Sequence, residues 1–301
     1  MARPPKCGSS AGLGVRILDP YAAPGAYRKA QLHLHTRRSG GRYEPADLAR
    51  RYREAGYAFV CFTDHNTVTR CDDVSDAAFL ALPGVEETIL RGVPPLGPHL
   101  GRLLVDDVLG AGTAEDRIRR TLDAGGVPCL NHPSWPGNFW TGTWPLDVIQ
   151  RMPRPLLIEV WNPHSDSDED ARRWTLASRA RGPESPLIAV AADDCHVDAQ
   201  FNRAWVMVKT AEVSAAALRA GLLSGALYAS TGIDAVFGVD AGAVIGRADA
   251  DEIVVIDAAT EVRMRAAGGA VRYEPAGDEG FVRVECRAGR RRAWSQAFWI
   301  T

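Results

Sequence analysis

The sequence predicts an α/β protein in which a barrel of about seven strands precedes a small antiparallel β-sandwich. Apolar runs typical of buried strands alternate with segments of helical spacing as far as residue 232. Most of these runs end in histidine or carboxylate residues, at intervals of roughly 30 residues, about one strand–helix unit. Beyond residue 232, short alternating segments follow one another without helical spacing, which is typical of a sandwich.

The first strand–helix–strand unit shows this pattern most clearly. The runs 30–34 and 57–62 are apolar, and apolar residues recur at helical spacing over 45–56 between them. His33 and His35 are two apart on the first run, so their side chains point to the same face of an extended strand. Two imidazoles on a buried face need a polar partner, and a shared metal ion is the simplest one.

Later segments repeat the alternation of strands and helices. We expect a turn and strand over 82–88, strands at 127–130, 156–160 and 187–192, and helices at 114–124, 168–181 and 213–227. Residues 70–80 form a loop or a short helix in this interpretation. Because strands that alternate with helices form parallel sheets, their polar carboxyl ends meet at one rim, where the active sites of such barrels lie.

Composition divides the chain into three parts. Residues 1–28 are rich in proline, glycine and alanine, so we expect a loosely ordered arm there. The barrel takes residues 29–232 and the sandwich takes residues 233–301. The sandwich strands are expected at 235–239, 252–257, 261–265, 270–273, 281–287 and 293–300.

Charge, hydropathy and cysteine usage exclude several classes of partner. A formal net charge of −2 argues against a general nucleic-acid coat and against an acidic-membrane binder. No apolar run approaches the length of a membrane span, and residues 1–14 lack the apolar stretch of a signal peptide. The six cysteines show no paired C-x-x-C spacing, and Cys61, Cys129 and Cys195 lie inside apolar runs. We therefore expect a reduced, cytoplasmic protein, and the sequence leaves its oligomeric state open.

The histidines are concentrated in one kind of position. The chain has seven, and all but one stand at strand ends or in loops next to acidic residues, namely His33, His35, His65, His99, His132 and His196. A single histidine is more often a satisfied core or surface residue than a ligand, but the concentration of nearly all of them favours metal binding. The exception, His164 in Asn-Pro-His-Ser, is either a substrate contact or a solvated loop residue, and we expect the latter.

Six ordered motifs make residues 31–232 resemble the PHP (polymerase and histidinol phosphatase) family of metal-dependent phosphoesterases. They are His33-Leu-His35-Thr36, Thr63-Asp64-His65-Asn66, Gly84-Val-Glu86, His99, Asn131-His132-Pro133 and Asp194-Cys-His196. The resemblance implies a distorted barrel of about seven strands. It also implies two, or three, clustered divalent metals, which are zinc, manganese or iron.

The resemblance also assigns ligands motif by motif. It implies that one metal is held by His33, His35, Glu86 and Asp194, that Glu86 bridges to a second held by His99 and His132, and that His65 and His196 belong to a third site. The sequence departs from the family after His35-Thr36, because Arg37-Arg38-Ser39-Gly40-Gly41 lacks the usual side chain. Two histidines alone make a thin cage, so we expect a dinuclear or partly occupied centre.

Several other residues are candidates for substrate contacts or for orienting ligands. Arg37, Arg38 and Arg42 either contact phosphate oxygens or lie solvated in their loop. Asn131 and Trp135 are expected to line the substrate pocket, and the tryptophans of this loop (Trp135, Trp140 and Trp144) either stack on a substrate ring or pack the loop. Glu159 either orients a ligand from the second shell or is satisfied by backbone amides.

This constellation supports hydrolysis of a phosphate ester. A water shared by two metals becomes a hydroxide nucleophile near neutral pH. Asp64 would orient a ligand or accept a proton, and His65 or His196 would protonate the leaving oxygen. We therefore expect a metal-dependent phosphoesterase that hydrolyses a small phosphomonoester, such as a nucleotide or sugar phosphate, by a metal-bridged hydroxide. The alternatives are a phosphodiesterase or oligonucleotide hydrolase, a metal-binding domain without activity, and non-phosphate chemistry in a specialised pathway.

Overall fold

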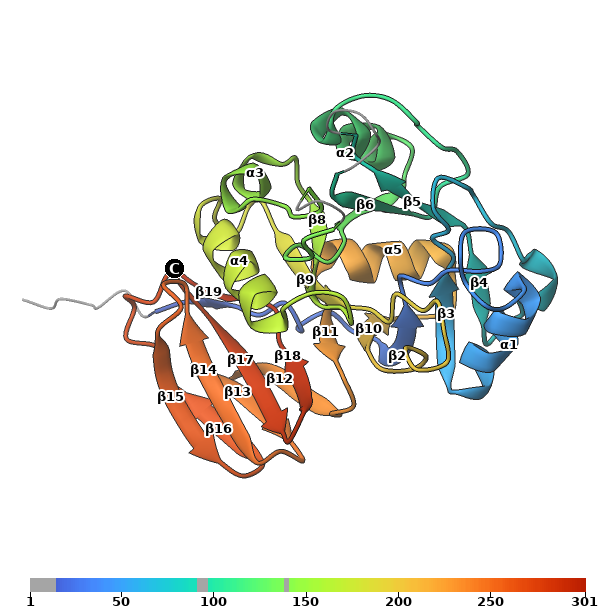
Figure 1. Cartoon of the computed structure of the whole chain (residues 1–301). Coiled ribbons are helices and arrows are strands. Elements are labelled where there is room, and N and C mark those ends of the chain that lie inside the picture. The colour runs from blue at the N-terminus through green and yellow to red at the C-terminus, as the bar shows by residue number, and fades with distance from the viewer. Residues whose placement is uncertain (1–14, 91–96, 138–140) are drawn as a thin grey trace, which may run out of the picture.

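The computed structural model describes residues 15–90, 97–137 and 141–301 and shows an α/β fold, as the sequence predicts (Figure 1). In this part of the chain the five α-helices are α1 (Pro45–Glu54), α2 (Ala114–Asp123), α3 (Leu146–Arg151), α4 (Ser167–Arg179) and α5 (Ala215–Ser224). A 3₁₀ turn, η1 (Asp72–Val74), lies in the segment expected to be a loop or short helix. No helix among these residues is both long and apolar enough to cross a bilayer.

Two neighbouring sheets carry the rim at which the candidate site lies. One contains, in spatial order, β5 (Gly84–Thr88), β6 (His99–Leu103), β7 (Val127–Leu130), β8 (Leu156–Trp161) and β9 (Leu187–Ala191). The other contains β11 (Leu227–Ser230), β10 (Trp205–Thr210), β2 (Ala26–Gln31), β3 (Tyr57–Cys61) and β4 (Leu80–Leu82). Strand β9 contacts β10 and β11, so the two sheets are adjacent.

The two sheets meet at the rim through isolated bridges. Leu34, beyond β2, pairs with Cys195, beyond β9, and His65, beyond β3, pairs with Glu86 of β5. No strand ladder among the described residues joins the sheets into a ring, so the closed seven-stranded barrel is not confirmed. The bridges nevertheless bring the segments that follow β2, β3 and β9 to the rim, where the middle of β5 also lies, and this is what the site requires.

The expectation of an entirely parallel sheet is wrong for two strands. The neighbours β7, β8 and β9 are parallel, and so are β2, β3 and β4. In contrast, β6 is antiparallel to β5 and β7, and β10 is antiparallel to β2 and β11. Residues 89–98, which connect β5 to β6, are too few for the crossover of about a dozen or more residues that a parallel pair needs.

Local sequence signals explain where the helices begin and end. Helix α1 starts at Pro45, where a missing N–H costs no intrahelical hydrogen bond. The side chains of Thr113 and Asp166 accept hydrogen bonds from the first turns of α2 and α4. Gly225 ends α5 in the left-handed conformation, with φ of 73°. The sequence pattern does not predict α3, because its one buried residue, Ile149, gives no periodic signal.

The N-terminal and C-terminal segments join the same sheet. The expectation of a loosely ordered arm over 1–28 is wrong for its described part, because β1 (Ile17–Leu18) pairs with β19 (Phe298–Ile300) and β2 begins at Ala26. Residues 1–14 lie outside the described residues. Strand β19 pairs with β17 (Phe281–Ala288), and β17 pairs with β18 (Arg291–Trp294). Strand β18 then pairs with β11, so hydrogen bonding runs across the division expected at residue 232.

The remaining strands enclose a second core. A three-stranded sheet contains β12 (Ala235–Asp240), β13 (Ala243–Ala248) and β16 (Ala270–Tyr273). It packs against β14 (Glu252–Asp257) and β17, while β15 (Val262–Ala267) extends the large sheet beyond β14. Phe237, Val244, Ile253 and Val284 are among the buried residues of this core. The segment therefore has two packed sheets, as the sequence predicts, but one of them continues the sheet that contains β2 and β10.

A buried ion cluster stabilises the region behind β5. Glu87 is fully buried and accepts hydrogen bonds from Arg102 at 2.9 Å and from Arg117 at 2.8 Å. Arg102 also reaches Asp107 at 2.8 Å and the hydroxyl of Thr121 at 2.8 Å. Because Arg102 and Arg117 are only 0% and 2% exposed, water cannot take the place of Glu87 as the hydrogen-bond partner of either guanidinium.

Replacing Glu87 with alanine should therefore lower the free energy of unfolding by about 3–5 kcal/mol, since it leaves the buried charge of Arg117 without a carboxylate and that of Arg102 with Asp107 alone. Urea denaturation followed by circular dichroism, with a chelator present, measures this change. The control Asp147→Ala removes only the exposed 2.9 Å pair with Arg151 and should have no measurable effect. Equal stability of the two variants would contradict a stabilising role for the cluster.

Candidate metal centre

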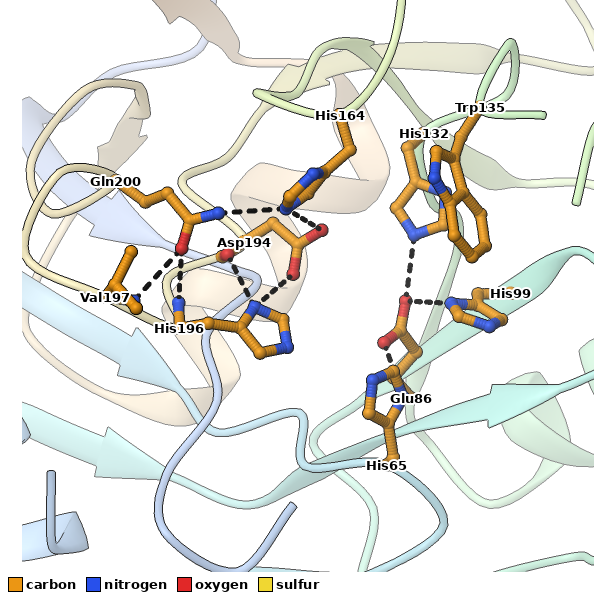
Figure 2. A pocket seen from close by; sticks show the side chains of 10 residues that line it. All are labelled: His65, Glu86, His99, His132, Trp135, His164, Asp194, His196, Val197 and Gln200. Atoms are coloured by element: carbon orange, nitrogen blue, oxygen red, sulfur yellow. Dashed lines mark hydrogen bonds and ion pairs between the residues drawn. The ribbon is translucent and has the colours of Figure 1, made fainter. Parts of the chain in front are cut away.

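The strand ends bring metal-binding side chains to one place. The side chains that the sequence predicts as ligands gather at the rim, although they lie up to 163 residues apart in the chain. They are His33, His35, His65, Glu86, His99, His132, Asp194 and His196. Figure 2 shows most of them around a cavity of about 290 Å³, called the rim cavity here. It is lined by His65, Glu86, His99, His132, Trp135, His164, Asp194, His196, Val197 and Gln200.

The carboxylate of Glu86 is the shared centre of this group. It is 1% exposed, and imidazole nitrogens approach both of its oxygens. Around Oε1 the distances are 3.2 Å to His33 Nε2, 3.1 Å to His99 Nδ1 and 3.2 Å to His132 Nε2. Around Oε2 they are 3.3 Å to His35 Nε2 and 3.0 Å to His65 Nδ1. A single buried carboxylate thus faces five histidines.

Two buried oxygens show that the site is suited to a cation. Glu86 Oε2 and Asp194 Oδ1 have no hydrogen-bond partner, although both lie among imidazoles. His33 Nε2 and His35 Nε2 face each other at 3.1 Å, and each lies within 3.3 Å of Asp194 Oδ1. Ligand atoms at about 2.0–2.1 Å from one ion lie about 2.8–3.4 Å from each other in octahedral or tetrahedral arrangements. The donor set therefore fits a divalent metal.

Glu159 fixes the orientation of His33. Its Oε1 accepts a hydrogen bond from His33 Nδ1 at 2.8 Å, which leaves the Nε2 lone pair directed at Glu86 and Asp194. Its Oε2 accepts from the backbone N–H of His132 at 2.6 Å and from the side chain of Asn162 at 2.8 Å. Both roles considered for Glu159, ligand orienter and backbone acceptor, are therefore present in one carboxylate.

A hydroxyl relay fixes the orientation of His35 in the same way. His35 Nδ1 lies 3.1 Å from Ser39 Oγ, and Ser39 Oγ donates to Asp64 Oδ1 at 2.6 Å. Asp64 is fully buried and also accepts from the backbone and hydroxyl of Thr36, at 2.8 and 2.7 Å, and from Thr69 at 2.5 Å. Asp64 does not line the rim cavity, so the structure supports its role in orienting a ligand and argues against a role as proton acceptor.

The arginines after His35 do not contact the cavity. Arg37 pairs with Glu44 at 3.5 Å and Arg42 pairs with Asp198 at 3.1 Å, while Arg38 is exposed. None of the three lines the rim cavity, so the structure supports the interpretation that these arginines lie solvated in their loop. The same loop needs a glycine at position 41 for a steric reason, because a Cβ on Gly41 would lie 2.1 Å from the carbonyl oxygen of His35.

Asn131 and the tryptophan loop are placed differently from each other. Asn131 is 2% exposed and donates to Glu86 Oε1 at 2.9 Å, so it orients the carboxylate and does not line the substrate pocket as expected. Trp135 does line the cavity, with its ring 4.8 Å from that of His132. Trp144 is buried and donates to the carbonyl of His99 at 3.1 Å, which is the packing role. Trp140 lies outside the described residues.

Three residues of the cavity were not expected from the sequence. His164, interpreted as a solvated loop residue, has its Nε2 at 3.8 Å from Asp194 Oδ2 and lines the cavity. Gln200 and Val197 line it as well. A signal for His164 was available, because it follows the end of β8 as the other histidines follow their strands. Gln200 and Val197 lie in a loop whose sequence gives no such signal.

Two of the candidate ligands are among the seven described non-glycine residues with a positive φ. His132 has φ of 31° and Asp194 has φ of 44°, both in the left-handed region that non-glycine residues rarely adopt. Such conformations persist only where surrounding contacts hold them, and they are common at functional sites. For His132, the contact is the hydrogen bond from its backbone N–H to Glu159.

Charges within the cluster shift the pKa values of its members in opposite directions. Burial would lower the pKa of His35, but hydrogen bonds with Asp194 and Glu86 raise it to about 9. Burial likewise opposes the charge on His33, while Asp194, Glu86 and Glu159 raise its pKa above the ordinary value. Burial would raise the pKa of Glu86, but His99 and His33 hold it well below the ordinary value. Protons on imidazoles therefore supply the positive charge that the buried carboxylates need.

Metal binding should consequently release protons and strengthen as the pH rises. A raised pKa means that His35 is protonated below about pH 9, and an ion must displace that proton to reach the nitrogen. Between about pH 6 and pH 9 the affinity for manganese or zinc should rise by up to about tenfold per pH unit for each proton displaced. Isothermal titration calorimetry in two buffers of different ionisation enthalpy measures both quantities. An affinity that does not change over this range would contradict proton competition at these histidines.

The hydroxyl relay gives a second prediction. Ser39→Ala removes the acceptor for His35 Nδ1 and its link to Asp64, so metal affinity should fall by about 10- to 100-fold. Equilibrium dialysis with metal analysis measures the change. Ser224→Ala in α5 is the matched control, because that hydroxyl bonds only to the backbone of its own helix end, far from the rim in the fold. Unchanged affinity in Ser39→Ala would mean that His35 is oriented by other contacts.

Comparison with known proteins shows similarity in fold. No protein-family profile matches the sequence, and no curated protein matches it. Among solved structures, a two-domain protein from Bacteroides vulgatus containing a predicted PHP-like metal-dependent phosphoesterase has a TM-score of 0.51 and 16% identity, covering 98% of this chain and 99% of its own.

Two further structures match less of the chain. A protein from Bifidobacterium adolescentis named as a metal-dependent phosphoesterase has a TM-score of 0.44 and 15% identity, covering 65% of this chain and 96% of its own. An amidohydrolase from Chromobacterium violaceum, with bound sulfate and no metal, has a TM-score of 0.40 and 17% identity, covering 56% of this chain and 88% of its own.

Proposed function

We propose that this chain, whose fold is similar to that of a two-domain protein containing a PHP-like metal-dependent phosphoesterase, is itself a metal-dependent phosphoesterase. The resemblance to the PHP family that the motifs suggested thus agrees with the fold. The observation that carries the proposal is the convergence of five imidazoles on the buried carboxylate of Glu86, beside a second buried carboxylate, Asp194. This donor set lies at the edge of an open cavity rather than inside a closed core.

The geometry suits two divalent ions that share Glu86. One would be held by His33, His35 and Asp194, and the other by His99 and His132. Imidazole and carboxylate donors suit zinc, manganese or iron. Ions held there would supply Lewis acidity, which lowers the pKa of water and neutralises the charge of a phosphate ester.

Of the two expected proton donors, His65 is the better placed. Its Nδ1 lies 3.0 Å from Glu86 Oε2, and its side chain is 34% exposed at the cavity. His196 donates through Nδ1 to the carbonyl of Asp194 at 3.0 Å, and burial followed by repulsion from His35 lowers its pKa. A lowered pKa leaves less of His196 protonated near neutral pH, so the better placed His65 would protonate the leaving oxygen.

The wall of the cavity suggests what the substrate looks like. Trp135 and Val197 give it an apolar side on which the ring of a nucleoside or sugar would pack. We therefore propose a small phosphomonoester as the substrate. A phosphodiester is the second candidate, because no lysine or arginine stands among the described residues that line the cavity. A diester carries one negative charge fewer than a monoester dianion and needs less compensation.

The hydrolase proposal predicts that His33→Ala and His132→Ala each reduce hydrolysis of an aryl phosphate with added manganese by about 100-fold or more. Each removes a donor to a different ion while circular dichroism should show the fold retained. Arg37→Ala, which changes an exposed residue of the nearby loop, should leave the rate unchanged. The panel of test substrates should include both phosphate monoesters and phosphate diesters. Wild-type protein that holds metal but hydrolyses no member of the panel would contradict the proposal.

A further inference from the structure

His164 is a metal-binding side chain that the two ions proposed above do not use. It lies between β8 and α4, and Figure 2 shows its ring directed at Asp194. Its Nε2 is 3.8 Å from Asp194 Oδ2, too far for a hydrogen bond. One ligand atom from each of His164, Asp194 and His196 lies within 4.8 Å of the other two. Three donors therefore meet on the side of Asp194 that faces the cavity mouth.

Gln200 determines the direction of the hydrogen bond to His164 in this arrangement. Its Oε1 accepts hydrogen bonds from the backbone N–H groups of His196, at 2.8 Å, and Val197, at 3.0 Å. Because backbone N–H groups can only donate, the amide orientation is fixed, and its Nε2 donates to His164 Nε2 at 2.9 Å. His164 Nε2 is therefore the acceptor of this hydrogen bond, and an ion can take its lone pair over from Gln200.

Asp194 has one oxygen available for each side. Its Oδ1 faces the first ion position, at 3.3 Å from His33 Nε2 and 3.1 Å from His35 Nε2. Its Oδ2 faces His164 and accepts from the side chain of Asn162 at 3.3 Å. A carboxylate so placed can bridge two cations, as Glu86 would on the other side of His33 and His35.

The other place for a third ion is less complete. His35, His65 and His196 also have ligand atoms within 4.8 Å of one another. However, His35 Nδ1 is bonded to Ser39 and His35 Nε2 faces the first ion position. Only two imidazoles remain there, and Gly40 adds no side chain beside His196. The position at His164 offers the imidazoles of His164 and His196 and an oxygen of Asp194. His196 Nδ1, which faces Asp194, would give up its 3.0 Å hydrogen bond to the carbonyl of Asp194 in order to bind an ion there.

We propose that His164, Asp194 and His196 hold a third divalent cation at the mouth of the rim cavity. This inference rests on the metal centre of the proposed function and adds a ligand that the sequence motifs do not include. The ion would place positive charge beside Val197 and Gln200, where no lysine or arginine stands among the described lining residues. Its open coordination positions would take phosphate oxygens of the substrate.

Metal binding without substrate tests the proposal. Wild-type protein, His164→Ala and the control Val197→Ala, which changes an equally accessible cavity residue without a ligand atom, are dialysed against graded manganese or zinc and analysed for bound metal. The wild type and the control should bind three ions. His164→Ala should bind two with unchanged affinity, and its affinity for the third should fall by at least about tenfold.

Three outcomes would overturn the proposal. The first is a wild-type protein that binds no more than two ions. The second is a third ion that persists in His164→Ala but is lost in His65→Ala, which would place it beside His35. The third is a His164→Ala variant that holds all three ions but has a higher KM, which would make His164 a substrate contact. Because the measurement of bound metal needs no turnover, loss of the third ion would support the inference even if no phosphate ester proves to be a substrate.

Discussion

The carboxylate of Glu86 is the constraint on which the rest of the site depends. A fully buried carboxylate is costly unless positive charge surrounds it, and here five imidazoles approach its two oxygens within 3.3 Å. These imidazoles come from β2, β3, β6 and β7 or from the residues that follow them. The strand ends must therefore meet at β5, and protons or metal ions must supply the charge.

The side chains that hydrogen-bond to the candidate ligands are themselves held in defined positions. Glu159 directs His33, the pair Ser39 and Asp64 directs His35, and Asn131 holds Glu86. Each contact leaves a lone pair pointing at the place where an ion would bind. Such orienting contacts stabilise a ligand geometry that the metal alone does not impose. They also account for residues that resemble substrate contacts or proton acceptors in the sequence but face away from the cavity.

The C-terminal strands belong to the scaffold of the site. Strand β18 pairs with β11, and the side-chain amide of Gln296 bonds to both backbone groups of Ala189 in β9, at 2.8 and 2.9 Å. Strand β9 leads directly to Asp194 and His196. A buried contact between Arg283 of β17 and Thr175 of α4, at 3.0 Å, adds a second connection. The two cores are therefore joined by hydrogen bonds that also hold one of the ligand-bearing strands.

The sequence by itself indicated most of the buried strands, though not β6 and β10, and showed that strand ends carry imidazoles and carboxylates, because strand and helix periodicities are local properties. It did not determine where loop side chains point. His164 lies in the cavity while Arg37 and Asn131 do not, because contacts with Gln200, Glu44 and Glu86, distant in sequence or across the loop, direct them. The predicted parallel direction was wrong for β6 and β10, since the reversal of these strands and the continuation from β11 into β18 depend on pairing between segments. Only the tertiary structure fixes such long-range partners.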